Sequence, residues 1–166
     1  MLAALETLRE KLPVTAQDIR RGLSEVEVAG RCQVLPGRPQ IVLDVAHNPQ
    51  AALALASALG EMGFAQSTYG IFGMMADKDI AGVVAAMSGR VAHWLICSLP
   101  GPRAATVESL ADEIRKVDAG ATLTHYADPA AALLFAQEMA GGDDRIVVFG
   151  SFLTVADVLR ALGRKA

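Results

Sequence analysis

The hydrophobic residues along most of this chain are arranged in a way that predicts short strands alternating with helices. From residue 30 onward, brief apolar runs alternate with longer segments in which apolar residues recur every three or four positions. Most of the brief runs are continuous, as is typical of strands buried on both faces. Six strands are expected, at Cys32–Leu35, Ile41–Leu43, Thr68–Phe72, His93–Cys97, Ala121–His125 and Ile146–Phe149.

Helical periodicity fills the intervals between the later strands. One helix is expected over Ala51–Met62, and another should begin at Asp128-Pro129, because proline favours the first helical position. The remaining apolar helix faces consist of Ile80, Val83, Val84 and Met87; Val107, Leu110, Ile114 and Val117; and Val155, Val158, Leu159 and Leu162. With right-handed crossovers, this order predicts an α/β fold: a Rossmann-like, doubly wound, mostly parallel six-stranded sheet with helices on both faces. No helix separates the first two strands, so one of them can be antiparallel.

Before residue 30 the pattern predicts two short helices and a linker. The apolar stripe of the first helix consists of Leu5, Leu8 and Leu12. Pro13 should end that helix, and Thr15 with Asp18 resembles a capping box that starts the second. Gly22 is expected to end the second helix, and residues 24–28 then form the linker.

Composition and charge narrow the class of protein. The chain has 166 residues, 52% of them hydrophobic, which fits one globular domain with its own core. Its net charge of −3 and scattered Lys and Arg residues argue against nucleic acid or an anionic membrane surface as a partner. No apolar run approaches the roughly 20 residues of a membrane span, and the amino terminus does not resemble a signal peptide. A cytoplasmic protein is expected, in which Cys32 and Cys97 are reduced, packed thiols.

The loop Asp44-Val45-Ala46-His47-Asn48-Pro49 contains the richest candidate chemistry. It follows an expected strand and enters a helix, and open α/β sheets bind ligands beyond the carboxyl ends of their strands. Asp44 can accept hydrogen bonds from sugar hydroxyls, His47 and Asn48 can donate to phosphate or carboxylate oxygens, and the helix N-terminus can receive an anion. Equally, Asp44 and Asn48 are residue types that cap helices, and His47 can be an ordinary surface residue.

Three further loops place polar side chains after expected strands. Lys78 could contact a ligand, although its segment also suits a solvated helix start. Arg103 could bind a carboxylate through two hydrogen bonds, although its Pro- and Gly-containing loop also suits an exposed turn. Ser151, after Gly150, either caps the last helix or contacts a ligand.

Several catalytic signatures are absent from the sequence. Because there is no G-x-x-x-x-G-K-[ST] phosphate loop and no G-x-G-x-x-G fingerprint, neither an independent ATPase nor a nicotinamide enzyme is supported. His47, His93 and His125 lack zinc-site spacing, and the last two are expected to be packing residues. No G-x-S-x-G nucleophile elbow is present. The residues alone therefore indicate an α/β domain with anion-binding loops.

The segment Asp44–Pro49 has the form D-x-A-H-N-P, which resembles the C-terminal signature of folylpolyglutamate synthases. These are the bacterial folylpolyglutamate and dihydrofolate synthase type of the Mur ligase superfamily. The likeness extends from Gly30 to the carboxyl terminus. The other matching segments are Gly30-Arg31, Phe72-Gly73, Asp77-Lys78-Asp79, Gly101-Pro102-Arg103 and Gly150-Ser151-Phe152.

This resemblance implies a domain organisation and an activity. Residues 29–166 would be the C-terminal domain, and residues 1–28 would be the tail of a central ATPase domain with its linker. The full-length protein would be an ATP-dependent ligase that adds L-glutamate to dihydropteroate or folate through an acyl phosphate. ATP and magnesium would be its cofactors, with the magnesium ligands mainly in the absent central domain. The isolated fragment is accordingly expected to be inactive.

The same resemblance implies roles for individual residues. Arg31 would contact the nucleotide phosphates and Asp44 the ribose of ATP, with His47 and Asn48 lining the same face. His47 would also be catalytic, stabilising with Arg31 the charge that develops during phosphoryl transfer. The implied contacts to glutamate are made by Arg103 and Ser151.

A second hypothesis is a stand-alone, non-catalytic α/β module that binds a nucleotide or an acidic metabolite. The absence of a phosphate loop from the sequence supports it. An upstream reading frame of about 250 or more residues containing such a loop would favour the ligase instead. A native start at Met1 would favour the module.

Overall fold

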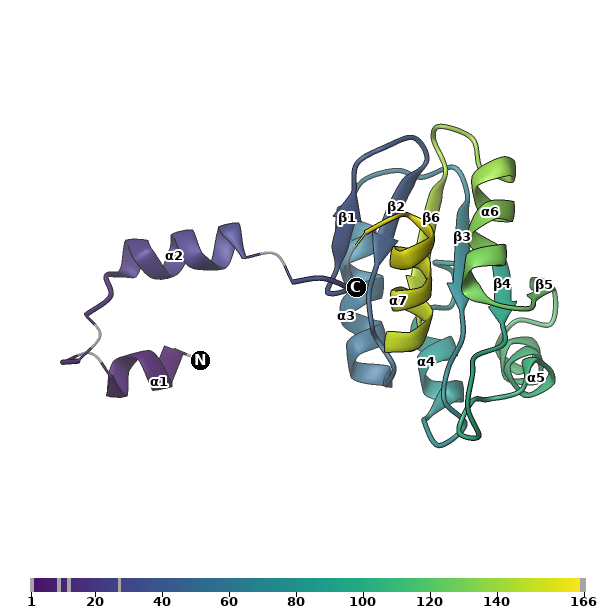
Figure 1. The fold of residues 1–166 in the computed structure, drawn as a ribbon, viewed down its shortest axis with the longest axis horizontal. Coiled ribbons are helices and arrows are strands. Elements are labelled where there is room, and N and C mark those ends of the chain that lie inside the picture. The colour runs from purple at the N-terminus through teal and green to yellow at the C-terminus, as the bar shows by residue number, and fades with distance from the viewer. Residues whose placement is uncertain (1, 9, 12, 27, 165–166) are drawn as a thin grey trace.

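A six-stranded sheet forms the centre of the molecule (Figure 1). The computed structural model describes residues 2–8, 10–11, 13–26 and 28–164. The strands are β1 (Gln33–Leu35), β2 (Gln40–Leu43), β3 (Thr68–Phe72), β4 (His93–Cys97), β5 (Thr122–Tyr126) and β6 (Arg145–Phe149). Their order in the sheet is β1-β2-β6-β3-β4-β5, and only the pairing of β1 with β2 is antiparallel. The predicted fold class and the antiparallel early strand are confirmed.

Helices cover both faces of the sheet, as expected for a doubly wound fold (Figure 1). One face packs against α3 (Pro49–Glu61), α4 (Ile80–Ala86) and α5 (Val107–Val117). The other packs against α6 (Pro129–Met139) and α7 (Phe152–Ala161). Alternate residues of each inner strand enter opposite cores, so that Val147 and Phe149 of β6 lie on the α3 side while Ile146 and Val148 lie on the α7 side.

The outermost parallel strand, β5, differs from its prediction. It begins and ends one residue later than expected, and instead of a buried run it has three exposed residues and two half-buried ones, Leu123 and Tyr126. An edge strand pairs on one side only, so its outer residues face water. His125 is therefore exposed, and its predicted packing role is wrong. His93 on β4 does pack, because its ring stacks on Tyr69 with centroids 4.7 Å apart.

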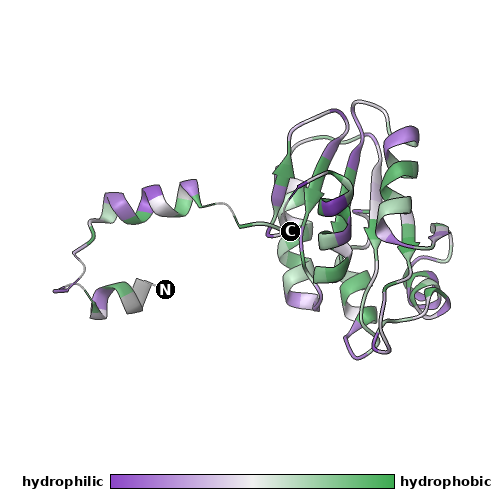
Figure 2. Cartoon of the chain, in the orientation of Figure 1, coloured by the Kyte–Doolittle hydropathy of each residue, from purple (hydrophilic) through white to green (hydrophobic). Residues whose placement is uncertain are grey.

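Two helices precede the sheet, and Figure 1 shows them standing apart from it. They are α1 (Leu2–Thr7) and α2 (Ala16–Glu25). The capping box of Thr15 and Asp18 is confirmed by reciprocal hydrogen bonds of 2.8 and 3.1 Å. Figure 2 shows hydrophobic and hydrophilic residues mixed along α2, and Leu23 is 51% exposed.

Both predicted helix ends in this region are wrong. α1 ends at Thr7, well before Pro13, and a backbone hydrogen bond from Leu8 to Leu5 tightens its last turn. Leu12 lies outside the described residues. α2 continues past Gly22 to Glu25, since a helical glycine costs only about 1 kcal/mol and does not by itself end a helix; the exposed Arg21–Glu25 ion pair of 2.9 Å spans this position. The predicted linker consequently starts inside the helix.

No helix in the described ranges has the length and apolarity needed to cross a membrane.

Candidate functional site

The sheet topology places a crevice beyond the carboxyl ends of β2 and β6. These strands are parallel neighbours, but β2 leads into α3 on one face and β6 into α7 on the other. Loops that leave neighbouring strands toward opposite faces open a crevice, which is where doubly wound sheets bind ligands. The backbone N–H of Gly150 donates to the Ala46 carbonyl (2.9 Å), which ties the two loops together. Asp44, His47, Asn48 and Ser151 all come from these loops, as the sequence predicted.

Asp44 is half-buried and uses both carboxylate oxygens within the chain. Its Oδ2 accepts the backbone N–H of Cys32 (2.7 Å) and its Oδ1 accepts that of Ala46 (2.7 Å). Hydrogen bonds from N–H groups to a carboxylate are among the stronger ones in proteins. Asp44 therefore connects the turn before β1 to the end of β2, and it does not cap a helix.

That turn carries Arg31. Gly30 has a φ of 67°, and its carbonyl accepts the backbone N–H of Val45 (2.8 Å). A Cβ on Gly30 would lie 3.1 Å from side chains of Val45 and Val155, so the turn sits tightly on β2 and α7. Cys32 adopts a φ of 43°, a conformation that few non-glycine residues take. Its hydrogen bond to Asp44 thus helps to set the backbone on which Arg31 is mounted.

The Arg31 side chain is exposed and has no acidic partner among the ion pairs of the described residues. Its guanidinium carbon lies 5.7 Å from the centroid of the Phe152 ring. This distance fits a cation–π contact. Because no carboxylate neutralises the guanidinium, it is available to an anionic ligand.

His47 and Asn48 follow Asp44 at the entrance to α3. The His47 Nδ1 lies 2.8 Å from the Val45 carbonyl oxygen. A carbonyl only accepts, so Nδ1 carries a proton and donates, which leaves Nε2 as the ring nitrogen that can face a ligand. Asn48 is the N-cap of α3, since its Oδ1 accepts the N–H of Ala51 (2.9 Å), and its amide NH₂ remains a possible donor.

The N-terminus of α3 has fewer free backbone N–H groups for an anion than the sequence suggested. Pro49 at the first helical position has no N–H, and the N–H groups of Ala51 and Ala52 donate to Asn48. In this first turn, only the backbone N–H of Gln50 has neither an intrahelical nor a capping acceptor. Positive charge at this edge of the sheet therefore comes mainly from Arg31.

Ser151 is buried and caps α7, because its Oγ accepts the N–H of Leu153 (3.1 Å). The residue before it, Gly150, has a φ of 105°, and a Cβ there would lie 2.5 Å from the Gly73 carbonyl oxygen. Only glycine fits this close approach. The cap interpretation of Ser151 is confirmed, although its hydroxyl hydrogen remains able to donate.

Arg103 lies in a second group, formed by the loops after β3 and β4. It donates to Asp77 Oδ2 at 2.8 Å, and Lys78 Nζ lies 3.8 Å from the same carboxylate oxygen. The hydrogen bond from Arg103 lowers the pKa of Asp77 and raises the pKa of Arg103 itself. The loops are also joined by the N–H of Ala76, which donates to the Arg103 carbonyl at 2.7 Å. Arg103 thus already has a carboxylate partner on the protein.

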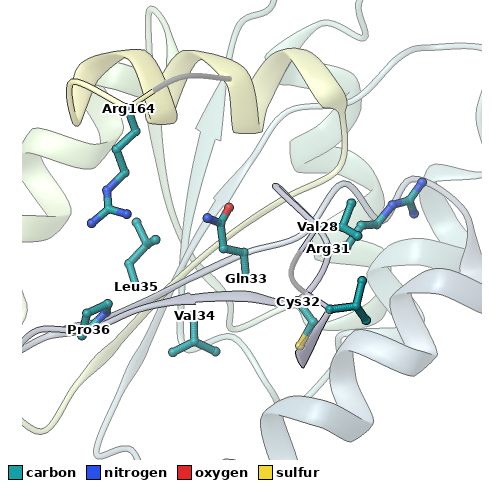
Figure 3. A pocket seen from close by; sticks show the side chains of 9 residues that line it. Val28, Arg31, Cys32, Gln33, Val34, Leu35, Pro36 and Arg164 are labelled. Carbon is teal, nitrogen blue, oxygen red and sulfur yellow. The ribbon is translucent and has the colours of Figure 1, made fainter. Parts of the chain in front are cut away.

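A cavity of about 370 Å³ lies beside the Arg31 turn (Figure 3). It is lined along β1 and reaches Arg164, but Asp44, His47 and Asn48 do not line it. In Figure 3 the Arg31 guanidinium points away from Arg164, toward the outside of this group of side chains. Of the residues predicted to bind the nucleotide, Arg31 therefore lines this cavity and the other three do not.

Metal ligands are not grouped in the described part of the chain, where no three His, Cys, Asp or Glu side chains cluster as a metal site requires. Cys32 and Cys97 are free thiols. The pKa of Cys32 is raised by burial and then by the negative charge of Asp44, and burial likewise raises the pKa of Cys97. The expectation of packed thiols without a disulfide agrees with the buried Cys97, whereas Cys32 is half-buried.

Comparison with known families then identifies the fold. Residues 30–152 match the family model described as "Mur ligase, glutamate ligase domain". The chain belongs to the Mur ligase family. The matched range starts at the Arg31 turn and ends at Phe152, so it contains every residue of the crevice described above.

Individual Mur ligase relatives agree with this assignment. The dihydrofolate synthase/folylpolyglutamate synthase of Escherichia coli (strain K12) is 34% identical over 160 residues, which cover 96% of this chain and 36% of the relative. The structure of E. coli FolC in complex with DHPP and ADP has a TM-score of 0.86 and 33% identity, covering 98% of this chain and 37% of that one. The structure of a bifunctional folylpolyglutamate synthase/dihydrofolate synthase with Mn, AMPPNP and L-glutamate bound has a TM-score of 0.84 and 38% identity. That match covers 98% of this chain and 38% of the other. The chain spans just over a third of the length of these relatives.

Proposed function

We propose that this chain is the C-terminal domain of an ATP-dependent ligase that adds L-glutamate to dihydropteroate or folate. The observation that carries the proposal is the glutamate ligase domain match over residues 30–152, a range that includes the Arg31 cation and Phe152 beside it. Relatives that share the fold were solved with ADP, an ATP analogue, DHPP or L-glutamate. We expect the ligase in the cytoplasm, with no nucleic acid or membrane partner.

The nucleotide would lie against the crevice beyond β2 and β6. Arg31 binds phosphate oxygens, for which an exposed guanidinium without an acidic neighbour is suited. Asp44 accepts a ribose hydroxyl with a lone pair that its two backbone hydrogen bonds leave free. His47 donates through Nε2 when its ring is the doubly protonated imidazolium, because Nδ1 already donates to Val45, and the Asn48 amide NH₂ is a second donor in the same loop.

In the proposed reaction the γ-phosphoryl group of ATP passes to a carboxylate oxygen of the folate substrate. ADP leaves, and the resulting acyl phosphate is attacked by the amine of L-glutamate, which loses a proton as phosphate departs and the amide forms. Arg31 and His47 stabilise the charge that develops on the transferred phosphoryl oxygens. Closure of this domain over the nucleotide excludes water, which otherwise hydrolyses the acyl phosphate.

Mg²⁺ in phosphoryl-transfer sites is held by one or two carboxylates plus substrate phosphates. Among the described residues no three metal-binding side chains gather, and Asp44, the one carboxylate among the proposed nucleotide-binding residues, already accepts a backbone N–H on each oxygen. The proposal therefore places the magnesium ligands mainly in the part of the ligase outside this chain.

Glutamate would be contacted by Arg103 and Ser151. Arg103 pairs with Asp77, yet its side chain is 67% exposed and has further donors for a carboxylate. Ser151 can donate its hydroxyl hydrogen while its oxygen caps α7. Each contact is thus compatible with the structural role that the residue already has.

The rest of the ligase would be an N-terminal ATPase portion, of which residues 1–28 are the tail. The chain covers only 36–38% of the relatives described above. Exposed apolar side chains on and after α2, Leu23, Val26 and Val28, have the character of a surface that packs against another domain. We accordingly place the domain boundary at residues 28/29.

The test uses the full-length ligase that carries this domain, with ADP release measured as a function of ATP in the presence of L-glutamate and dihydropteroate. Arg31→Ala removes a charged hydrogen-bonding group and should raise KM for ATP or lower kcat/KM by about 10- to 150-fold. The matched control is Arg38→Ala, because Arg38 is 81% exposed, lies in the loop before β2 and has only a 3.8 Å ion pair. It should leave the kinetics unchanged.

The isolated 166-residue chain provides the second arm of the test. It should show no turnover, because the proposal assigns the phosphate loop and metal ligands to the missing portion. Turnover by the isolated chain, or unaltered kinetics of the Arg31→Ala ligase, would contradict the proposed function. Nucleotide binding by a protein that natively lacks any upstream domain would favour the stand-alone binding module.

A further inference from the structure

Phe152 is an exposed aromatic residue whose ring lies beside two of the proposed ligand-binding side chains. It is the first residue of α7 and is 59% exposed. Its ring centroid is 5.7 Å from the Arg31 guanidinium carbon and 6.0 Å from the centroid of the His47 ring. Single exposed apolar residues are ordinary on protein surfaces, but this one contacts groups from two other segments of the chain.

The backbone around Phe152 is fixed by the fold. Ser151 caps α7, and the N–H of Gly150 donates to Ala46 in the loop that carries His47. Gly150 has no free space around it, since a Cβ there would lie 2.5 Å from a backbone oxygen. In the next turn of chain, Thr154 Oγ1 donates to the Gly73 carbonyl at 2.8 Å. The ring is therefore mounted on a rigid part of the domain.

The Arg31 side chain is less restrained than the Phe152 ring, because only the backbone of Arg31 is fixed. The hydrogen bonds of Gly30 and Cys32 fix the turn, whereas the exposed Arg31 side chain has no acidic partner among the described ion pairs. A long, unpaired arginine samples many rotamers. A cation–π contact at an exposed site favours the stacked rotamers roughly 2- to 5-fold.

We propose that Phe152 is a positioning residue for Arg31: its ring holds the guanidinium on the His47 side of the crevice before an anionic ligand binds. The inference rests on the proposed function, in which Arg31 binds the phosphates of a nucleotide. Pre-positioning lowers the cost of ordering Arg31 on binding, so the ring contributes to nucleotide affinity without touching the nucleotide.

The test is a double-variant cycle in the full-length ligase, with KM for ATP and kcat measured separately. Phe152→Leu should raise KM for ATP roughly 2- to 5-fold, which is the loss of the rotamer preference. In the Arg31→Ala background the same substitution should have no further effect. Phe152→Tyr keeps the ring and should restore the wild-type KM. Leu153→Ala is the matched control, because Leu153 is the neighbouring residue of α7, is 38% exposed and should not alter KM.

A structural measurement accompanies the kinetics. The ring current of Phe152 should shift the Arg31 side-chain Hε resonance, and this shift should be lost in Phe152→Leu and kept in Phe152→Tyr. If Arg31→Ala raises KM but Phe152→Leu does not, or acts equally in both backgrounds, the positioning role is wrong while the proposed function stands. If Arg31→Ala itself leaves KM unchanged, the proposed nucleotide site fails instead.

Discussion

Replacing Asp44 by asparagine tests whether this residue connects two segments of the fold or merely faces solvent and ligand. Its carboxylate accepts two backbone N–H groups, from Cys32 and from Ala46, one on each oxygen. Asparagine has a single acceptor oxygen, and its NH₂ group would meet the second N–H donor to donor. Asp44→Asn must therefore give up one of the two hydrogen bonds and the negative charge that strengthens the other.

The expected cost follows from these two bonds. A hydrogen bond to a charged group contributes about 1.5–3 kcal/mol, and that figure applies because Asp44 is half-buried and both distances are 2.7 Å. For a domain of this size, about 1 kcal/mol corresponds to roughly 2–4 °C, so the midpoint of unfolding should fall by about 3–12 °C. A helix-capping Asp44 would predict almost no change, since asparagine caps as well as aspartate.

The assay combines thermal unfolding with hydrogen exchange of the Cys32 amide. That amide should exchange faster in Asp44→Asn, because its acceptor is weakened or lost. Asn48→Asp is the matched control: it is the same exchange of side chains in reverse, in the same loop, and the introduced carboxylate still caps α3. It should change stability by no more than about 0.5 kcal/mol. If both variants unfold alike and Cys32 exchange is unaltered, the structural role assigned to Asp44 is refuted.

Three further changes have defined outcomes. Gly150→Ala should cost at least about 2 kcal/mol in denaturant unfolding, since a φ of 105° is combined with a contact of 2.5 Å, whereas Gly101→Ala, with a φ of 98° and open space, should cost less. Arg145→Met should cost about 2–4 kcal/mol by the same measurement, because this buried guanidinium donates to one side chain and two backbone carbonyls. The hydrogen bond from Arg103 lowers the pKa of Asp77 in the folded state. The pair therefore stabilises the fold at pH values above the pKa that Asp77 has in the unfolded chain, and this stabilisation is lost as the pH falls through the folded-state pKa of Asp77. The free energy of unfolding of Asp77→Asn should therefore be lower than that of the wild type at neutral pH, and the two should become equal when unfolding is measured at acidic pH.

The sheet could be predicted from the sequence almost to the residue because its strands are buried runs. Thr68–Phe72 and His93–Cys97 have the predicted bounds, β1, β2 and β6 differ by one residue at their first position, and β5 is shifted by one residue at both ends. β5 differs most from its prediction in burial. It lies at the edge of the sheet, and which strand lies at the edge is set by the topology and not by the residues of that strand. The predicted helix ends near Pro13 and Gly22 were wrong in opposite directions. α1 stops at Thr7, before the proline, as expected of a short helix with little packing to extend it, and α2 runs on through a glycine that costs only about 1 kcal/mol.

The candidate site could be predicted only as a set of loops. Asp44, His47, Asn48 and Ser151 were found because polar residues follow buried strands, and the two caps, Asn48 and Ser151, followed from residue type. The acceptors and donors that they use within the chain could not be predicted. The Cys32 N–H reaches Asp44 only because β1 and β2 pair antiparallel, which brings the start of one strand beside the end of the other.

Two contacts between distant segments were also missed. Arg103 was a candidate either for binding a carboxylate or for an exposed turn, and its partner in the structure is Asp77 on the neighbouring loop. Phe152 appeared only as part of a matching motif, and no role was assigned to it, because nothing in the sequence places its ring beside Arg31. The signal that was available was its chemistry: a large aromatic residue at the start of the helix that follows a buried strand, at a position that faces solvent.

The distribution of hydrogen bonds determines which groups remain for a ligand. The backbone around the crevice is satisfied within the domain: Cys32 and Ala46 donate to Asp44, Gly150 donates to Ala46, and Ala51 donates to Asn48. The turn, the loop and the two helix starts are consequently held by hydrogen bonds within the domain. The groups left over are side-chain donors, the Gln50 N–H and a lone pair of Asp44. Since α3 retains few free N–H groups, an anion at this edge depends on the Arg31 guanidinium, so affinity should follow the placement of that one cation more closely than the helix dipole.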